Sequence, residues 1–314
     1  MIQHTIPRSA RDFAPNLVGC ALRAEEMVHE YTPQREGSVR QQHSSHAFLY
    51  GLDDGVAGLG CTAWVLWSLG YPDQALKKTQ EMLPLAQSLF HPLSLAWALN
   101  SAAWHYRFRR DEQAAYELAE AEIALCTEHG FVHLLAAGII VQGWALAVQG
   151  QGAKGIAQMH QGLATLQAVG AVIGWPLSVT ALAEGYGEIG QPESGLTVLT
   201  EARARTNDTG TCFYEAEVYR LKGELTLKQT KVQSLESRAP NEAEECFRQA
   251  IDIAQRQSAK ALELRAVMSL ARLWQKQGKQ KPAHKMLARI YNWFTEGFDT
   301  TDLREAQALL QALE

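Results

Sequence analysis

A unit of about forty residues recurs along this chain, and it restricts the possible folds more than any other feature of the sequence. Each unit contains a short turn that is followed by a residue with a small side chain or none. Six of these small residues, at intervals of 39, 41, 40, 48 and 40 residues, are Ala75, Ala114, Gly155, Gly195, Ala243 and Ala283. The sequence therefore predicts a repeat array, although a length of 314 residues would ordinarily suggest two compact domains.

The stretches on either side of each turn have the pattern of amphipathic helices. Apolar residues recur in them every three or four positions, and no stretch alternates as a β-strand would. Gly70 and Gly190 stand where a helix is expected to end, and Pro72 and Pro192 stand where the next helix is expected to begin. Each unit is therefore predicted to be a helical hairpin.

A second column of small residues supports the hairpin model. Each residue of this column lies twelve positions before one of the six small residues given above, when the polar insertion at 228–238 is left out of the count. The column consists of Ala63, Ala102, Gly143, Ala183, Gly223 and Ala271. One small residue on each helix would let the two backbones of a hairpin approach closely. These residues resemble tetratricopeptide repeats, which have the same small pair around a glycine-containing turn, although the usual repeat has about 34 residues. The resemblance implies an all-α, right-handed superhelical solenoid with a period near 40 residues.

A closer likeness is carried by residues 46–55 (HAFLYGLDDG), 143–152 (GWALAVQGQG), 213–224 (FYEAEVYRLKGE), 262–274 (LELRAVMSLARLW) and 293–299 (WFTEGFD). They look like the C-terminal repeat region of large bacterial ATPase signalling proteins. Such proteins often begin with a class III nucleotide cyclase or a protein kinase domain, followed by a nucleotide-switched ATPase. This sequence has neither module, so the resemblance implies neither activity here.

The periodicity also predicts where the parts of the chain begin and end. Residues 1–45 are expected to form an N-terminal flanking helix and a polar linker, and residues 46–297 to form six hairpins. Residues 298–314 are expected to form a capping helix, because Asp299 to Asp302 offer an N-cap and first-turn acids. Repeat arrays need a polar-backed cap at their ends.

Charge and cysteine content limit the expected partners and compartment. The net charge of −5 gives no electrostatic reason to expect nucleic acid or an anionic membrane as a partner. The five cysteines are scattered without a C-x-x-C pair, which is typical of reduced thiols. No apolar run is long enough for a membrane span, and residues 1–13 lack the apolar core of a signal peptide. A cytoplasmic protein is expected.

Motifs that would indicate catalysis or cofactor binding are weak. Gly185 to Gly190 spell G-x-G-x-x-G, but they fall in a predicted helix rather than between a strand and a helix. His129 and His133, like His43 and His46, lack further ligands that would complete a zinc site. The chain has no nucleophile elbow and no phosphate-binding loop. We therefore expect no enzyme activity, no catalytic residues, no metal and no cofactor.

The helical register predicts which side chains face the concave surface of the array. The first three hairpins contribute an aromatic wall, Trp64, Trp67, Tyr106 and Trp144. The last three contribute charged residues, Glu184, Arg220, Glu224, Arg265 and Arg272. Tryptophan and tyrosine are frequent anchors of a bound partner, and arginine pairs well with carboxylates.

Two functions fit this groove. The first is a non-catalytic scaffold that binds a protein or peptide in regulation or signalling, and the second is a sensor whose groove binds a small-molecule effector. Residues 1–12 would equally fit as an occupant of the groove. The aromatic side chains have a plain structural alternative too, because they would also suit packing between neighbouring hairpins.

Overall fold

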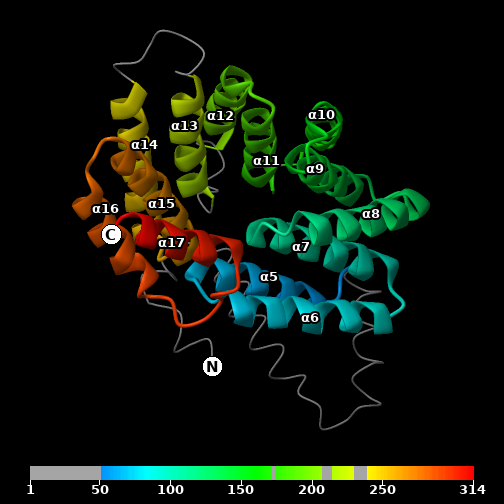
Figure 1. Cartoon of the computed structure of the whole chain (residues 1–314). Coiled ribbons are helices and arrows are strands. Elements are labelled where there is room, and N and C mark those ends of the chain that lie inside the picture. Colours follow the sequence, from blue (N-terminus) through cyan, green and yellow to red (C-terminus); the bar gives the residue numbers. More distant parts are fainter. Residues whose placement is uncertain (1–50, 172–173, 207–213, 230–238) are drawn as a thin grey trace.

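The computed structural model describes residues 51–314 except 172–173, 207–213 and 230–238, and all of its regular structure is helical (Figure 1). The expected flanking helix and linker in residues 1–45 lie outside the described residues. The helices are α5 Asp54–Leu69, α6 Pro72–Ser88, α7 Pro92–Arg109, α8 Glu112–His129, α9 Val132–Val148, α10 Gly152–Ala168, α11 Trp175–Glu188, α12 Pro192–Thr206, α13 Glu215–Gln229, α14 Ala239–Arg256, α15 Lys260–Lys276, α16 Gln280–Tyr291 and α17 Thr301–Ala312. None of these described helices is both long and apolar enough to cross a lipid bilayer.

The helices from α5 to α16 form six hairpins, and each hairpin packs on the next. Left-handed glycines end the first helix of four of them, with φ of 93° at Gly70, 88° at Gly150, 72° at Gly190 and 75° at Gly278. A residue with a Cβ is strained in this conformation, which explains why glycine recurs at the turn. The predicted all-α array of tetratricopeptide-like hairpins is confirmed.

Small residues meet where the two helices of a hairpin cross. A Cβ placed on Gly155 would lie 2.3 Å from the carbonyl oxygen of Gly143, so these two backbones touch directly. A Cβ on Gly223 would lie 2.6 Å from the ring of Phe247 on the partner helix. The predicted small pairs therefore do allow close helix approach, and a larger side chain at Gly155 has no room.

In the second hairpin, the structure shifts the predicted repeat alignment by one residue. Arg110, rather than a glycine, takes the left-handed position there with φ of 59°. The fully buried small residue five positions later is Ala115, whereas Ala114 is half-buried. The prediction of Ala114 was wrong. Two arginines precede the turn and two alanines follow it, so the residue types alone do not determine which alanine packs inside the hairpin. The inward positions of α7 shift accordingly to Trp104 and Arg107.

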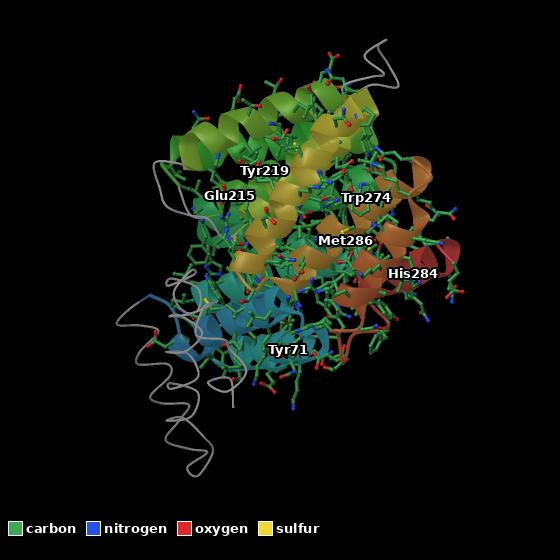
Figure 2. All side chains as sticks on the ribbon, turned by 90° about the vertical axis from the view of Figure 1, so that its left-hand side faces the viewer. Tyr71, Glu215, Tyr219, Trp274, His284 and Met286 are labelled. Carbon is green, nitrogen blue, oxygen red and sulfur yellow. The ribbon has the colours of Figure 1, made fainter. Side chains whose placement is uncertain are left out.

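The array bends round until its two ends meet, so that it forms a closed ring (Figure 1). The carboxylate of Glu296 accepts hydrogen bonds from the main-chain N–H groups of Asp73, at 3.0 Å, and Gln74, at 3.1 Å. The N–H of Gly297 donates to Asp73 in return, at 3.0 Å. We call these contacts the clasp. Figure 2 shows this side of the ring, with Tyr71, between α5 and α6, below the orange helix α16 that carries His284 and Met286.

Helix α17 lies against α15 and α16 and reaches toward α7 (Figure 1). Its apolar residues, such as Leu303 and Ala306, are buried with residues of α15 and α16. Its acidic residue Asp302 pairs with Arg265 of α15 at 2.7 Å and with Arg110, which ends α7, at 3.3 Å. The final helix therefore connects the last hairpin to the second one.

Candidate functional site

A cavity of about 150 Å³ lies inside the ring, between α7, α11, α13, α15 and α17. Its lining contains equal numbers of cationic and acidic residues. The cationic residues are Arg107, Arg110, Arg220, Lys228, Arg265 and Arg272. The acidic residues are Glu184, Glu188, Glu217, Glu224, Asp302 and Glu305. A cavity with this lining suits a polar, charged ligand.

The structure brings the charged residues predicted from the sequence together at this cavity. All five line it: Glu184, Arg220, Glu224, Arg265 and Arg272. They come from three successive hairpins, so their proximity depends on the stacking of α11, α13 and α15 against one another. A binding role for these residues is a proposal that their position supports.

The predicted aromatic wall needs correction. Trp67 and Trp144 are only 3% and 2% exposed, so neither ring is open to a partner. Trp64 and Tyr106 are half-buried and pack against the same hydrophobic core. The Trp64 indole N–H also donates to the carbonyl oxygen of Ser101 at 3.0 Å. The helical register places Trp64, Trp67 and Trp144 on the inner side of their helices, whereas the shift in the second hairpin puts Trp104 rather than Tyr106 there. Because the ring closes tightly, this inner side is part of the hydrophobic core.

Two arginines cover the buried tryptophans. The guanidinium of Arg265 lies over the ring of Trp67 at 5.0 Å from its centroid. That of Arg107 lies 5.4 Å from the centroids of both Trp104 and Trp144. Such cation–π contacts stabilise a buried guanidinium. The aromatic residues thus act as a platform that fixes cations at the cavity.

Glu184 on α11 is held at the cavity from two sides. Its Oε2 accepts from the Arg107 guanidinium at 3.2 Å and from the Trp144 indole N–H at 2.9 Å. The Nε of Arg107 is buried without a hydrogen-bond partner. A buried, unpaired guanidinium N–H is unfavourable, and a ligand that accepts from it would remove that penalty.

The centre of the lining is an ion-paired group on α13. Arg220 binds Glu217 through two hydrogen bonds of 2.8 and 2.7 Å, and it donates to Glu224 at 2.6 Å. Burial alone would raise the pKa of Glu217, but Arg220, with Arg265 and Arg107, lowers it to about 2. The pKa of Glu224 is also lowered, because Arg220 and the hydroxyl of Ser269 outweigh its burial. Both carboxylates are therefore ionised at neutral pH.

A second set of ion pairs joins α15 to α17. Arg272 donates to Glu305 at 2.7 Å, and Arg110 reaches the same carboxylate at 2.9 Å. Burial alone would lower the pKa of Arg265, but Asp302 and Glu217 raise it above its usual range. No lining residue in the described part of the chain is a histidine or a cysteine.

Sequence reasoning missed several lining residues. Arg107 was missed because of the one-residue error in the second hairpin, and recognising Arg110 as the residue in the glycine position would have found it. Asp302 and Glu305 were missed because α17 was treated only as a cap. Tyr214, buried just before α13, lies outside the helical register that was used. Its pKa is raised to about 12, first by burial and then by Glu217.

The G-x-G-x-x-G motif lies within and at the end of α11, and its Gly187 lines the cavity. A Cβ on Gly185 would lie 2.7 Å from the methyl group of Met159, so Gly185 serves helix packing. His43 and His46 lie outside the described residues. His129 ends α8 with its ring stacked on Phe131, and His133 is on α9, where burial lowers its pKa.

No family model matches this chain. It is 28% identical over 243 residues to an uncharacterised protein of Rhizobium meliloti (strain 1021), and the match covers 77% of this chain. The chain spans about a fifth, 22%, of that relative's length.

Among solved structures, the chain is similar to a signal transduction ATPase with numerous domains that has a tetratricopeptide repeat sensor, from Pyrococcus horikoshii. That match has 14% identity and a TM-score of 0.48, and it covers 93% of this chain and 42% of the other. The chain is also similar to tetratricopeptide-like repeats of a putative kinesin light chain from Podospora anserina, at 16% identity and a TM-score of 0.38, covering 82% and 96%.

Proposed function

We propose that this chain is a non-catalytic binding module whose interior cavity holds a small polar effector. The charged cavity inside the ring is the observation that supports this proposal most directly, because five helices contribute charged side chains to it. A partly open cavity of about 150 Å³ accommodates a small molecule, whereas a long peptide would need an extended groove. The effector-sensing alternative is thus preferred here over a peptide held along the concave face.

The chemistry of the lining supports recognition rather than catalysis. General acid–base catalysis works best with a group whose pKa lies near the operating pH. Glu217 and Glu224 have lowered pKa values, and the pKa values of Arg220 and Arg265 are raised. The hydroxyl of Ser269 donates to Glu224 at 2.7 Å, and no histidine among the described lining residues is placed to activate it. Permanent charges of this kind orient a ligand but do not exchange protons with it.

A regulatory role is proposed from the way the cavity and the ring closure are connected. Arg265 lines the cavity and is bonded to Asp302 of α17, and α17 follows the loop that carries Glu296 of the clasp. A ligand that binds the closed ring better than an opened one would shift the population toward closure. In a longer cytoplasmic signalling protein, this shift would report that the effector is present.

A screen of small polar metabolites against the purified chain tests the proposal. A ligand at a hundred times its dissociation constant should add about 2.7 kcal/mol to the free energy of unfolding. We expect at least one compound to raise the melting temperature, and we expect Arg272→Gln to abolish that rise. If no compound stabilises the chain, or if the best compound stabilises the variant equally, the proposed effector site is wrong.

A protein or peptide scaffold is the second candidate function. Phe90 is 90% exposed, and Val132 and Val169 are also exposed. Phe90 and Val169 lie in the links that follow α6 and α10, and Val132 is the first residue of α9, so all three lie near junctions between successive hairpins. Apolar side chains repeated along one edge fit contact with another protein. Replacing Phe90 and Val132 by serine should weaken such binding without lowering the melting temperature.

A further inference from the structure

We propose that the interior cavity binds a small zwitterion, a molecule with one carboxylate and one ammonium group such as a free α-amino acid. This inference rests on the proposed effector function and names its ligand class. It is drawn from the charge balance of the lining, the geometry of its ion pairs and the size of the cavity.

The charge balance favours a ligand with both signs of charge. The lining has six cationic and six acidic residues, and they are paired with one another. An anionic ligand would add a negative charge to a lining whose charges already balance, and a cationic ligand would add a positive one. A zwitterion adds no net charge, because its ammonium group balances the charge of its carboxylate.

Some ion pairs are better placed than others to open for a ligand. Arg272 and Glu305 are joined at 2.7 Å, and their side chains are 43% and 34% exposed. Arg220 and Glu217, in contrast, are almost completely buried and doubly bonded. We assign Arg272 to the ligand carboxylate, with Arg110 beside it, because these two guanidinium groups already share the carboxylate of Glu305.

The ammonium group has two further acceptors in the same cavity. Glu224 makes its bonds to Arg220 and Ser269 through Oε1, and Glu184 makes its bonds to Arg107 and Trp144 through Oε2. Each carboxylate therefore has a second oxygen for a ligand. Both residues line the cavity on the side of α11 and α13, while Arg272 lies on α15, so the ligand would bridge from one side to the other.

The cavity also limits the size of the ligand. A space of about 10 to 15 Å³ by this measure holds one water molecule. The cavity of about 150 Å³ therefore holds roughly ten waters, which corresponds to a ligand of about ten non-hydrogen atoms. A free amino acid is of this size and would fit entirely within the cavity.

Isothermal titration calorimetry with the twenty free α-amino acids tests the proposal directly. The tightest binder is then compared with its N-acetyl derivative, which is only anionic, and its carboxamide, which is only cationic. We expect both derivatives to bind at least tenfold more weakly than the zwitterion. Equal affinity of either derivative would overturn the assignment of a paired-charge site.

Variants locate the binding site. Arg272→Gln and Glu224→Gln should each weaken binding at least tenfold. Arg248→Gln is the matched control, because Arg248 on α14 is 61% exposed, forms an ion pair with Glu244 and does not line the cavity. Melting curves followed by circular dichroism establish that each variant is folded. Unchanged affinity in both cavity variants would place the ligand elsewhere and refute the proposal.

The outcome also separates this inference from the proposed function. If the metabolite screen finds a stabilising compound that is not a zwitterion, the cavity is an effector site but the ligand class is wrong. If neither the screen nor the amino-acid titrations give a binder, both the effector function and the zwitterion assignment fail.

Discussion

The guanidinium of Arg265 on α15 donates a hydrogen bond to the main-chain carbonyl oxygen of Phe108 on α7, which precedes it by 157 residues. The same guanidinium lies over Trp67 and pairs with Asp302. One side chain thus connects the first, second and sixth hairpins with the final helix. The buried charge of Arg265 therefore joins the sixth hairpin to the first two hairpins, which lie far from it in the sequence.

Arg265→Met is expected to destabilise the chain by about 3 to 5 kcal/mol, because Asp302 and Glu217 would keep their charge and lose a buried partner. Urea denaturation followed by circular dichroism measures the change. Arg248→Met serves as the control, since that exposed arginine is expected to change the free energy of unfolding by less than about 0.5 kcal/mol. Similar values for the two variants would show that Arg265 does not support the ring.

Trp144→Ala should lower the free energy of unfolding by about 3 to 5 kcal/mol, because Trp144 is a buried core residue. Phe90→Ser removes an aromatic ring that is almost fully exposed and should change stability little. Chemical denaturation of the two variants compares them. A stable Trp144→Ala protein would mean that this ring is not part of the core.

Gly155→Ala tests the closest helix contact. The added methyl group would fall 2.3 Å from the carbonyl oxygen of Gly143 and 2.8 Å from the N atom of Ala147, so the two helices must move apart. Overpacking of this kind destabilises by about 1 to 3 kcal/mol, despite the higher helix propensity of alanine. The neighbouring exposed change Lys154→Ala should leave the melting temperature nearly unchanged. A gain in stability for Gly155→Ala would contradict the close approach.

His105 should make the chain less stable in acid. Burial, followed by the charge of Arg109, lowers the pKa of His105 from 6.5 to about 3. Between these values the unfolded chain binds a proton that the folded chain does not, so the stability contributed by neutral His105 is present above pH 6.5 and is lost as the pH falls toward 3.

Glu122 has the opposite effect on the pH dependence of stability, because burial raises its pKa well above 4.5. The measurement is therefore the difference in unfolding free energy between the wild type and His105→Gln, taken from pH 7 to pH 4.5. We expect the wild type to lose more stability than the variant over this range. A pH-independent difference would show that the folded chain protonates His105 as readily as the unfolded chain does.

Local features of the fold were predictable from the sequence. The turns at Gly70, Gly150, Gly190 and Gly278 have the left-handed geometry that glycine favours, and Gly143 and Gly155 do meet. These features depend on residues within one hairpin, where sequence spacing determines spatial position. The error at Ala114 arose where Arg110 occupies a position that elsewhere belongs to glycine.

The position of the cavity could not be predicted from the sequence. It depends on contacts between distant parts of the array, and such contacts leave no periodic pattern. Helical register indicated that Trp144 and Glu184 point the same way, but it did not indicate how far the array bends. The bend decides that Trp144 is buried and that Glu184 lines a cavity. Asp302 reaches the cavity only because α17 follows the closed end of the ring, which a pattern within one repeat does not encode.

The clasp has a consequence for how such an array can change by gene duplication. An open solenoid can gain or lose whole repeats, because each unit contacts only its neighbours. Here Glu296 must meet the start of α6 after a fixed total rotation, so deleting or adding one hairpin would separate Glu296 from Asp73. Between Asp73 and Glu296, the number of hairpins is thus tied to the geometry of closure.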